Sequence, residues 1–218
     1  MAKQREICEQ MVGKVNEWQA ALGQLNLLAS YAEQKKSLSI SFSDCNLQQD
    51  KHLQALLAEL SIANVLSISD NTAIKFSDEK SRFFSNGGWL EYYVNSLLNQ
   101  LKSEHIIQDS ARLNLKIRSA MGSENELDIA FMANNHLHII ECKTKRFTGA
   151  KAGLAGTDAL YKLDSISDLG GFGTKSMLVS YRQLQDADRQ RAKDLRIKVI
   201  EGDAIQQLKT HLKTWLER

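Results

Sequence analysis

Four charged residues lie in two short β-type segments on either side of the dipeptide Asn134-Asn135. With that dipeptide as a two-residue hairpin loop, Asp128 lies opposite Glu141. The next pair outward on the same face is Glu126 and Lys143, because residues two apart on a strand share a face. Two carboxylates ~5 Å apart repel by about 3 kcal/mol at an effective dielectric of ~20. The pattern therefore predicts that a divalent metal and a lysine neutralise the acids.

The elements that must position these residues follow one order from residue 87 onward: a helix, three strands, then helix, strand, helix, strand and helix. Apolar residues three and four positions apart predict the helices, and alternation of apolar and polar residues predicts the strands. The predicted helices span residues 89–101, 157–169 and 186–195 with a last one after Asp203, and the remaining strands span 113–117, 176–181 and 197–200. This order predicts an α/β domain over residues 81–218.

The first 80 residues predict a smaller, mostly helical domain. Helical spacing marks residues 5–35 and 51–60, and strand-like alternation marks residues 37–42, 65–69 and 72–76. The last two segments flank Asp70-Asn71 and predict a hairpin. Helices followed by a hairpin indicate a winged-helix-like domain over residues 1–80. Such a domain either binds nucleic acid or serves as a dimerisation or spacer module.

Composition narrows the classes of function. Of the 218 residues, 43% are hydrophobic and 25% are charged, with a net charge of +2, as is typical of a globular protein. Any nucleic-acid-binding surface must therefore be local. No apolar run approaches the roughly 18 residues of a membrane span, and no signal-peptide core follows the N-terminus. The three cysteines form no CxxC pair, so we expect free thiols and a cytoplasmic protein.

An acidic residue on one strand and a Glu-x-Lys motif on the next resemble the PD-(D/E)XK nuclease superfamily. Asp128 matches the first acid of that pattern, with Leu127 in the place of proline, and residues 141–143 match the Glu-x-Lys. The predicted helix before these strands and the helix and strand after them fit the same superfamily. The resemblance implies a restriction-endonuclease-like mixed sheet flanked by helices.

A narrower resemblance covers nearly all of the second half. Residues 87–94, 125–128, 138–144 and 160–163 are similar to the nuclease half of CRISPR-associated CARF-domain nucleases, which cyclic oligoadenylate activates in type III systems. The resemblance implies metal-dependent cleavage of RNA and DNA, a homodimer and a winged-helix-like domain before the nuclease. That family carries an N-terminal Rossmann-like sensor, whereas about 80 residues precede the nuclease half here. The chain is either a shortened form or a relative without the sensor, so we expect cyclic-oligoadenylate control only through a sensor domain outside it.

The residue types at the acidic patch indicate a metal-dependent hydrolytic site. Asp128 and Glu141 would hold Mg²⁺ or Mn²⁺, because hard cations take oxygen ligands. The superfamily resemblance adds the backbone carbonyl of Cys142 as a ligand. Lys143 would orient the attacking water or stabilise the charge that develops on the phosphate. The resemblance also implies that Glu91, in the helix before the sheet, is a further acid that binds the metal directly or through water.

Three other ionisable residues border this patch. Glu126 is either an outer acid of the metal site or only the ion-pair partner of Lys143. His136 lies next to the turn, and His138 falls on the face of the sheet opposite Glu141. We therefore expect neither histidine to be catalytic.

A basic run follows the Glu-x-Lys motif and indicates contact with a polyanion. Lys145, Arg146 and Lys151 would bind the phosphate backbone of a nucleic acid. Tyr161 and Lys162 lie near the start of the next helix, where related nucleases often place a polar residue that faces the cleft. We expect these five residues to form the nucleic-acid-binding surface.

Two other functions remain open from the sequence. In the first, the chain is a non-catalytic nucleic-acid-binding or dimerisation module, and the acids and Lys143 form a structural salt-bridge cluster. In the second, the chain is a metal-dependent hydrolase of a small substrate, although a neutral substrate would not need the basic run. The sequence does not separate RNA from DNA as substrate, because nuclease sites of this kind act on phosphate and sugar.

Overall fold

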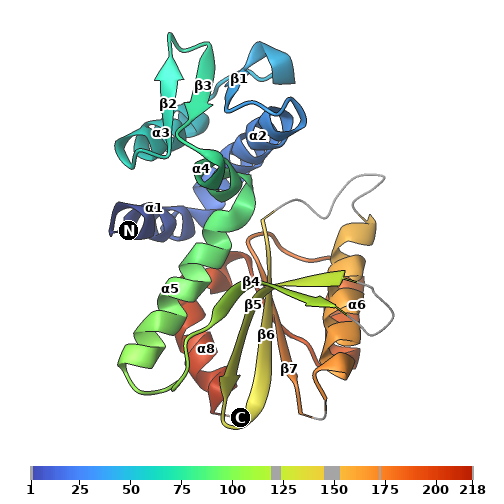
Figure 1. The fold of residues 1–218 in the computed structure, drawn as a ribbon. Helices are drawn as coiled ribbons and strands as arrows, with labels where there is room; N and C mark the ends of the chain where they lie inside the picture. The colour runs from blue at the N-terminus through green and yellow to red at the C-terminus, as the bar shows by residue number, and fades with distance from the viewer. Residues whose placement is uncertain (1, 119–123, 145–152, 172, 218) are drawn as a thin grey trace. The chain divides into compact units, whose positions relative to one another are not determined.

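The computed structural model describes residues 2–118, 124–144, 153–171 and 173–217 (Figure 1). These residues form two compact units, Met1–Tyr93 and Val94–Arg218. The division falls inside α5 (Trp89–Ser103), which is the helix predicted over residues 89–101. The domain limits drawn from the sequence, 1–80 and 81–218, stay a prediction.

The first unit combines helices with a small antiparallel sheet. Its helices are α1 (Ala2–Gly13), α2 (Val15–Gln34), α3 (Lys51–Ile62) and α4 (Glu79–Phe83), its strands are β1 (Ser39–Ser41), β2 (Leu66–Ser69) and β3 (Ala73–Phe76), and a 3₁₀ turn (Ser43–Cys45) and a π-helical segment (Phe84–Gly88) complete it. The strands lie in the order β1-β3-β2. The predicted hairpin and the predicted helix over residues 51–60 are confirmed. The long helix predicted over residues 5–35 is divided at Gly13.

Helix α3 begins where the sequence supplies a capping side chain. The Asp50 carboxylate accepts hydrogen bonds from the N–H groups of His52 at 3.0 Å and Leu53 at 2.8 Å. These bonds satisfy two of the donors that the first turn of a helix leaves unpaired. The buried face of the helix consists of Leu53, Leu56, Leu57 and Leu60. A capped start and an apolar face together fix α3 in the first unit.

The second unit is a five-stranded mixed sheet with flanking helices. Its strands are β4 (Arg112–Arg118), β5 (Glu124–Ala133), β6 (His136–Lys143), β7 (Lys175–Ser180) and β8 (Lys198–Glu201), and its helices after α5 are α6 (Gly153–Leu169), α7 (Asp186–Asp194) and α8 (Leu208–Leu216), with a 3₁₀ turn (Gly202–Gln207) before α8. The sheet order is β4-β5-β6-β7-β8, antiparallel from β4 to β6 and parallel from β6 to β8. The predicted order of elements and the mixed α/β fold are confirmed.

The β5–β6 hairpin has the register predicted from its turn. Asn134 and Asn135 have φ angles of 49° and 60°, the left-handed values that a type I′ turn requires at both central positions and that asparagine tolerates. Ile129 pairs with Ile140, as a two-residue loop at this dipeptide demands. The Asn134 side chain also donates a hydrogen bond to the Leu216 carbonyl at 2.8 Å, which ties the turn to the end of α8.

Helices cover both faces of this sheet, with α6 on one side and α8 on the other (Figure 1). Leu160 and Leu163 of α6 pack against Ile139 of β6 and Leu178 of β7 in one buried cluster. Ile139 and Glu141 are two residues apart on β6 and share a face. Helix α6 therefore lies on the side of the sheet that carries Glu141.

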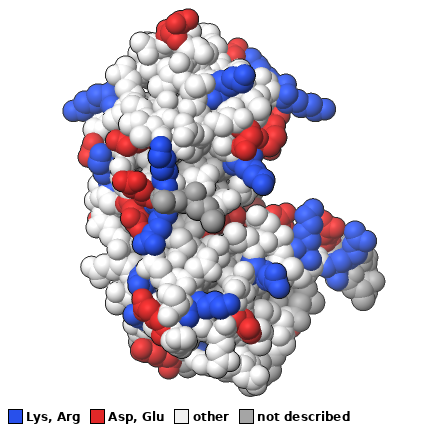
Figure 2. Space-filling model, turned by 60° about the vertical axis from the view of Figure 1, so that its left-hand side comes forward, with Lys and Arg blue, Asp and Glu red and all other residues white. Residues whose placement is uncertain are grey.

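The surface carries no strong charge bias on the face shown in Figure 2, where the described Lys and Arg side chains are interspersed with Asp and Glu. This distribution agrees with the net charge of +2 and with the expectation that any nucleic-acid-binding surface is local. Within the described ranges, no helix is long and apolar enough to cross a membrane.

The opposite face of the sheet buries His138 among aromatic side chains. The imidazole is 0% exposed, stacks on Phe131 with ring centroids 5.1 Å apart and meets the Trp215 ring edge-on at 4.8 Å. Its Nδ1 forms a hydrogen bond with the His136 carbonyl at 3.0 Å. Burial away from water lowers the pKa of His138 to about 4. His138 is therefore a neutral core residue on the face away from Glu141, as predicted.

Acidification should destabilise the protein through His138. The unfolded chain regains the ordinary pKa of ~6.5, so it binds a proton before the folded protein does as the pH falls. The stabilisation is complete above about pH 6.5 and is lost toward pH 4. Chemical denaturation would measure the unfolding free energy of the wild type and of His138→Phe at about pH 7.5 and about pH 5. Between these two pH values, the wild type should lose roughly 2 kcal/mol more than His138→Phe. The exposed-site control His105→Asn should behave as the wild type, and equal losses in the wild type and His138→Phe would contradict this account.

Candidate active site

The two predicted acids lie where β5 and β6 stop pairing. The last backbone pair of the hairpin is Ile129 with Ile140, one residue before Asp128 and Glu141. Beyond it, the Oδ2 atom of Asp128 accepts a hydrogen bond from the backbone N–H of Cys142 at 2.7 Å. The Glu141 charge acts on Asp128 across this point. The register therefore brings the two carboxylates together, as predicted, at the end of the hairpin pairing.

The backbone pairing of β5 and β6 ends before it reaches Glu126 and Lys143, so the predicted opposition of these two residues stays a prediction. Glu126 is exposed and pairs with Lys116 of β4, whereas the Lys143 ammonium bonds to Glu141. The prediction assumed that the hairpin pairing continues to the ends of both strands. The Asp128 carboxylate interrupts it by taking a backbone N–H of β6. A role of Glu126 as an outer acid of the site stays a prediction.

Glu141 is a buried carboxylate held by two lysines. It is 1% exposed, and its Oε1 accepts a bond from Lys143 Nζ at 2.6 Å. Lys162 of α6 reaches the same carboxylate, with Nζ 2.9 Å from Oε2 and 3.1 Å from Oε1. A buried charge is tolerated only when it is paired and hydrogen-bonded. The sequence placed Lys162 near the cleft, but its direct bond to Glu141 is a feature that only the structure reveals.

The charges in this cluster shift one another's proton affinities. Burial raises the pKa of Asp128 to about 6, and the nearby Glu141 charge acts in the same direction. The N–H bond from Cys142 and the charges of Lys143 and Lys162 oppose this shift. Burial by itself would lower the pKa of Lys143, but the charge of Glu141, the hydrogen bond to it and the charge of Asp128 together outweigh that effect and leave the pKa raised. The site therefore holds a positively charged lysine beside a carboxyl group that gains a proton near pH 6.

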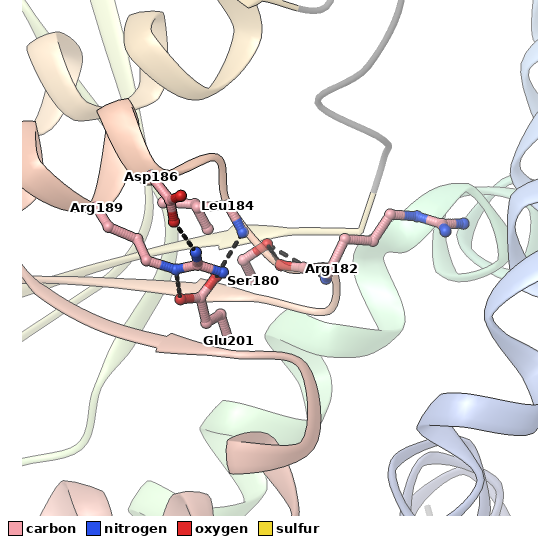
Figure 3. Close-up of polar contacts among 6 residues, drawn as sticks. All are labelled: Ser180, Arg182, Leu184, Asp186, Arg189 and Glu201. Atoms are coloured by element: carbon pink, nitrogen blue, oxygen red, sulfur yellow. Dashed lines mark hydrogen bonds and ion pairs between the residues drawn. The ribbon is translucent and has the colours of Figure 1, made fainter.

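The loop after β7 is fastened to the same end of β6. The Tyr181 N–H donates to the Lys143 carbonyl at 2.8 Å, and Arg182 Nε donates to the Thr144 carbonyl at 3.3 Å. The Ser180 hydroxyl donates to the Arg182 carbonyl at 2.6 Å. Figure 3 shows the Arg182 side chain extending away from the other labelled residues. No sequence pattern points to Arg182, because its position depends on the parallel pairing of β6 and β7.

Glu201 of β8 holds the following part of this loop, between β7 and α7 (Figure 3). Its carboxylate accepts the backbone N–H of Leu184 and, at 2.6 Å, the Nε of Arg189. Arg189 also bonds to Asp186 at 2.6 Å. These contacts connect β8 to the first turn of α7. They fix the course of the chain beside the end of the Glu-x-Lys strand.

The structure describes some of the remaining predicted site residues and not others. Lys145, Arg146 and Lys151 lie outside the described residues. Glu91 lies in the first turn of α5, within the first unit, and its role as a further acid stays a prediction. Tyr161 of α6 is an exposed aromatic residue, and its contact with nucleic acid stays a prediction. The Cys142 side chain is buried and takes part in no disulfide, as expected of a core side chain on the face opposite Glu141.

The oxygen atoms at this site suit a hard cation. Across the described part of the chain, no three His, Cys, Asp or Glu side chains gather as a metal-binding group. The two carboxylates that the structure brings together here are those of Asp128 and Glu141. Mg²⁺ is commonly bound by one or two carboxylates and keeps several waters, whereas zinc sites draw on three or four His, Cys or carboxylate side chains. The donor set fits Mg²⁺ or Mn²⁺.

Removing the Glu141 charge should lower the pKa of Asp128. In Glu141→Gln the two lysines keep their charges, so the pKa should fall from about 6 toward its ordinary value of 3.8. In Lys162→Met it should rise instead, because one favourable charge is lost. Carbon-13 NMR titration of labelled aspartate in EDTA would measure both shifts. Asp78, which caps α4 in the first unit, should have the same pKa in the wild type and in both variants. An Asp128 pKa that neither substitution changes would disprove the coupling.

Two solved structures are similar to this chain over nearly its whole length. The crystal structure of protein VC1899 from Vibrio cholerae has 36% sequence identity and a TM-score of 0.88, covering 99% of this chain and 56% of that one. The structure of Can2 from Sulfobacillus thermosulfidooxidans in complex with cyclic tetra-adenylate has 33% identity and a TM-score of 0.78, covering 99% and 57%. This chain thus spans little more than half the length of either protein. A comparison with curated protein sequences gave no match.

A family match covers the second unit and the acidic site. Residues 78–218 match the family described as Card1-like, endonuclease domain. The matched region is more than half of the chain and includes Asp128, Glu141, Lys143 and Lys162. The chain therefore belongs to the family of proteins with a Card1-like endonuclease domain.

Proposed function

We propose that this protein is a divalent-metal-dependent endonuclease that hydrolyses phosphodiester bonds in RNA or DNA. The observation that carries the proposal is the pairing of Asp128 with the buried Glu141 at the end of β5–β6, where Lys143 and Lys162 both reach the same carboxylate. This arrangement supports the resemblance to PD-(D/E)XK nucleases on which the proposal draws, and it lies inside the region that matches an endonuclease family.

Asp128 and Glu141, with the Cys142 carbonyl, are the groups that would hold Mg²⁺ or Mn²⁺. A cation bound there supplies Lewis-acid activation of water and charge compensation at the phosphate. The protein's part is to keep both acids close together despite their repulsion, which the two lysines and the Cys142 N–H achieve. Because Asp128 gains a proton near pH 6, the full ligand charge is available only above that pH.

The two lysines are placed to act on a phosphate as well as on Glu141. Their side chains are 35% and 31% exposed for Lys143 and Lys162, whereas the Glu141 side chain is 2% exposed. Each ammonium therefore bridges the buried acid and the solvent from which a substrate arrives. Lys143, fixed by its bond to Glu141, would orient the attacking water or donate to the phosphate oxygens. Lys162 would add a second positive charge on the α6 side.

The proposal extends to a role in defence and to the binding partners of the whole protein. Can2 was solved with cyclic tetra-adenylate, and this chain covers little more than half of it. We propose a CRISPR-associated effector that works as a cytoplasmic homodimer. Cyclic oligoadenylate would control it only through a sensor domain outside this chain. The helices and the β2–β3 hairpin of the first unit would form the winged-helix-like domain.

One observation favours a competing function, a non-catalytic binding module with a structural acid–lysine cluster. Both Glu141 oxygens are bonded to lysines, so the cluster is electrostatically satisfied by the protein itself. In that case Lys143→Ala would leave the buried Glu141 carboxylate with Lys162 as its lysine partner and lower the stability of the protein, because one of two compensating charges is lost. No preparation would cleave nucleic acid.

Cleavage should depend on the metal and on three side chains. Labelled single-stranded RNA, single-stranded DNA and supercoiled plasmid would each be incubated with Mn²⁺, Mg²⁺ or EDTA. Cutting should occur only with metal. Asp128→Asn, Glu141→Gln and Lys143→Met should each reduce it by about 100-fold or more, because they remove a ligand or a transition-state charge.

The matched control is Glu124→Gln, which removes an exposed carboxylate of the same strand as Asp128. It should retain most of the activity. Full cutting by folded Glu141→Gln would disprove the mechanism, and loss of cutting in Glu124→Gln equal to that in Asp128→Asn would show that the site is assigned wrongly.

Mn²⁺ binding should weaken as Asp128 gains its proton. Metal ligands must be deprotonated, so affinity should be constant above about pH 7 and fall by up to about tenfold per pH unit below pH 6. Isothermal calorimetry across this range would measure it, with Asp128→Asn as the variant that lacks the titrating group. Equal affinities at about pH 7.5 and about pH 5 would exclude Asp128 as a ligand.

A further inference from the structure

An exposed aromatic residue of α6 directly precedes Lys162, one of the two lysines of the candidate active site. Lys162 reaches the buried Glu141, so this turn of the helix is beside the acidic site. Tyr161, the preceding residue, is 51% exposed. An exposed tyrosine by itself is ordinary. What separates this one from other surface tyrosines is its position beside Lys162 and the group that lies over its ring.

Arg191 of α7 lies over the Tyr161 ring, with its guanidinium carbon 5.5 Å from the ring centroid. Its Nη1 donates to Asp188 Oδ1 at 2.9 Å and to Thr157 Oγ1 at 3.0 Å. Thr157 in turn donates to Asp188 at 2.9 Å. Asp188 is 4% exposed, so the guanidinium is anchored to a buried acid. Tyr161 is thereby backed on one face by a fixed cation.

A ring fixed in this way suits a nucleobase. Bases stack on aromatic side chains, and an arginine beside the ring strengthens the contact through cation–π attraction. Because Arg191 covers part of the ring and half of the residue is still exposed, Tyr161 keeps surface for a second planar partner. Its pre-ordered position lowers the entropy that a flexible side chain would lose on binding.

We propose that Tyr161, backed by Arg191, is a base-stacking contact that positions the substrate strand beside the acidic site. This inference rests on the proposed nuclease function. A base that stacks here must be unpaired, so the contact would favour a strand that is single-stranded or locally melted. It would act on substrate binding rather than on the chemical step, because the ring itself takes no part in hydrolysis.

The test is binding of two labelled single strands of equal length in EDTA, one carrying adenine bases and one entirely abasic. Fluorescence anisotropy would compare the wild type with Tyr161→Leu and Tyr161→Phe, each checked by thermal denaturation. Tyr161→Leu should weaken binding of the adenine strand about tenfold and leave the abasic strand unchanged. Tyr161→Phe should bind both strands as the wild type does, because it keeps the ring.

A charge-matched pair tests the backing cation. Arg191→Gln should reduce affinity for the adenine strand by severalfold, whereas Lys193→Gln, an exposed lysine on the same helix, should have little effect on the difference between the two strands. Equal losses for the adenine and abasic strands in Tyr161→Leu would mean a backbone contact and overturn the inference, as would a Tyr161→Phe defect as large as that of Tyr161→Leu.

The outcomes also separate this inference from the function on which it rests. If the wild type binds the strands but Tyr161→Leu binds the adenine strand equally well, only the stacking contact is overturned. If the wild type binds neither strand at low salt, where phosphate contacts are strongest, the inference is overturned, and the metal-dependent cleavage assay on plasmid decides the nuclease proposal by itself.

Discussion

The buried charge of Glu141 is the constraint to which the rest of the second unit responds. A carboxylate that is 1% exposed must be paired, and its partners come from different elements, Lys143 from the same strand and Lys162 from α6. Helix α6 can deliver Lys162 only if it lies across this end of the sheet. Leu160 and Leu163 hold it there by packing on the sheet. Apolar packing and charge compensation thus select one placement of the helix.

Asp128 adds a second constraint at the same place. Its carboxylate takes the Cys142 N–H, and the hairpin pairing ends one residue earlier. A side chain that replaces a backbone partner keeps the buried donor satisfied and brings a second acid beside Glu141. Burial and this like charge raise the pKa of Asp128 to about 6. Two acids kept close against their repulsion are expected where a cation is to be bound, because a cation removes the repulsion that the protein tolerates without it.

Local sequence patterns were sufficient to predict the hairpin register but not the contacts between distant segments. The dipeptide Asn134-Asn135 set the hairpin register, because asparagine tolerates the two left-handed positions and alternation then assigns each face. The end of the pairing one residue before Asp128 was not predicted, since no local pattern reports that a carboxylate takes a backbone N–H there. The bonds of Lys162 to Glu141 and of Arg182 to the end of β6 depend on how α6 and β7 pack. Such contacts between distant segments leave no periodic signal in one sequence.

The metal site formed by Asp128 and Glu141 is the part of the mechanism to test first. A crystal of the protein soaked in Mn²⁺ would locate the ion by its anomalous scattering. One strong peak should lie roughly 2.0–2.4 Å from oxygens of both Asp128 and Glu141, and at least one lysine should give up its bond to Glu141. No anomalous peak there, with both lysines still bonded to Glu141, would show instead that the acids form a structural cluster.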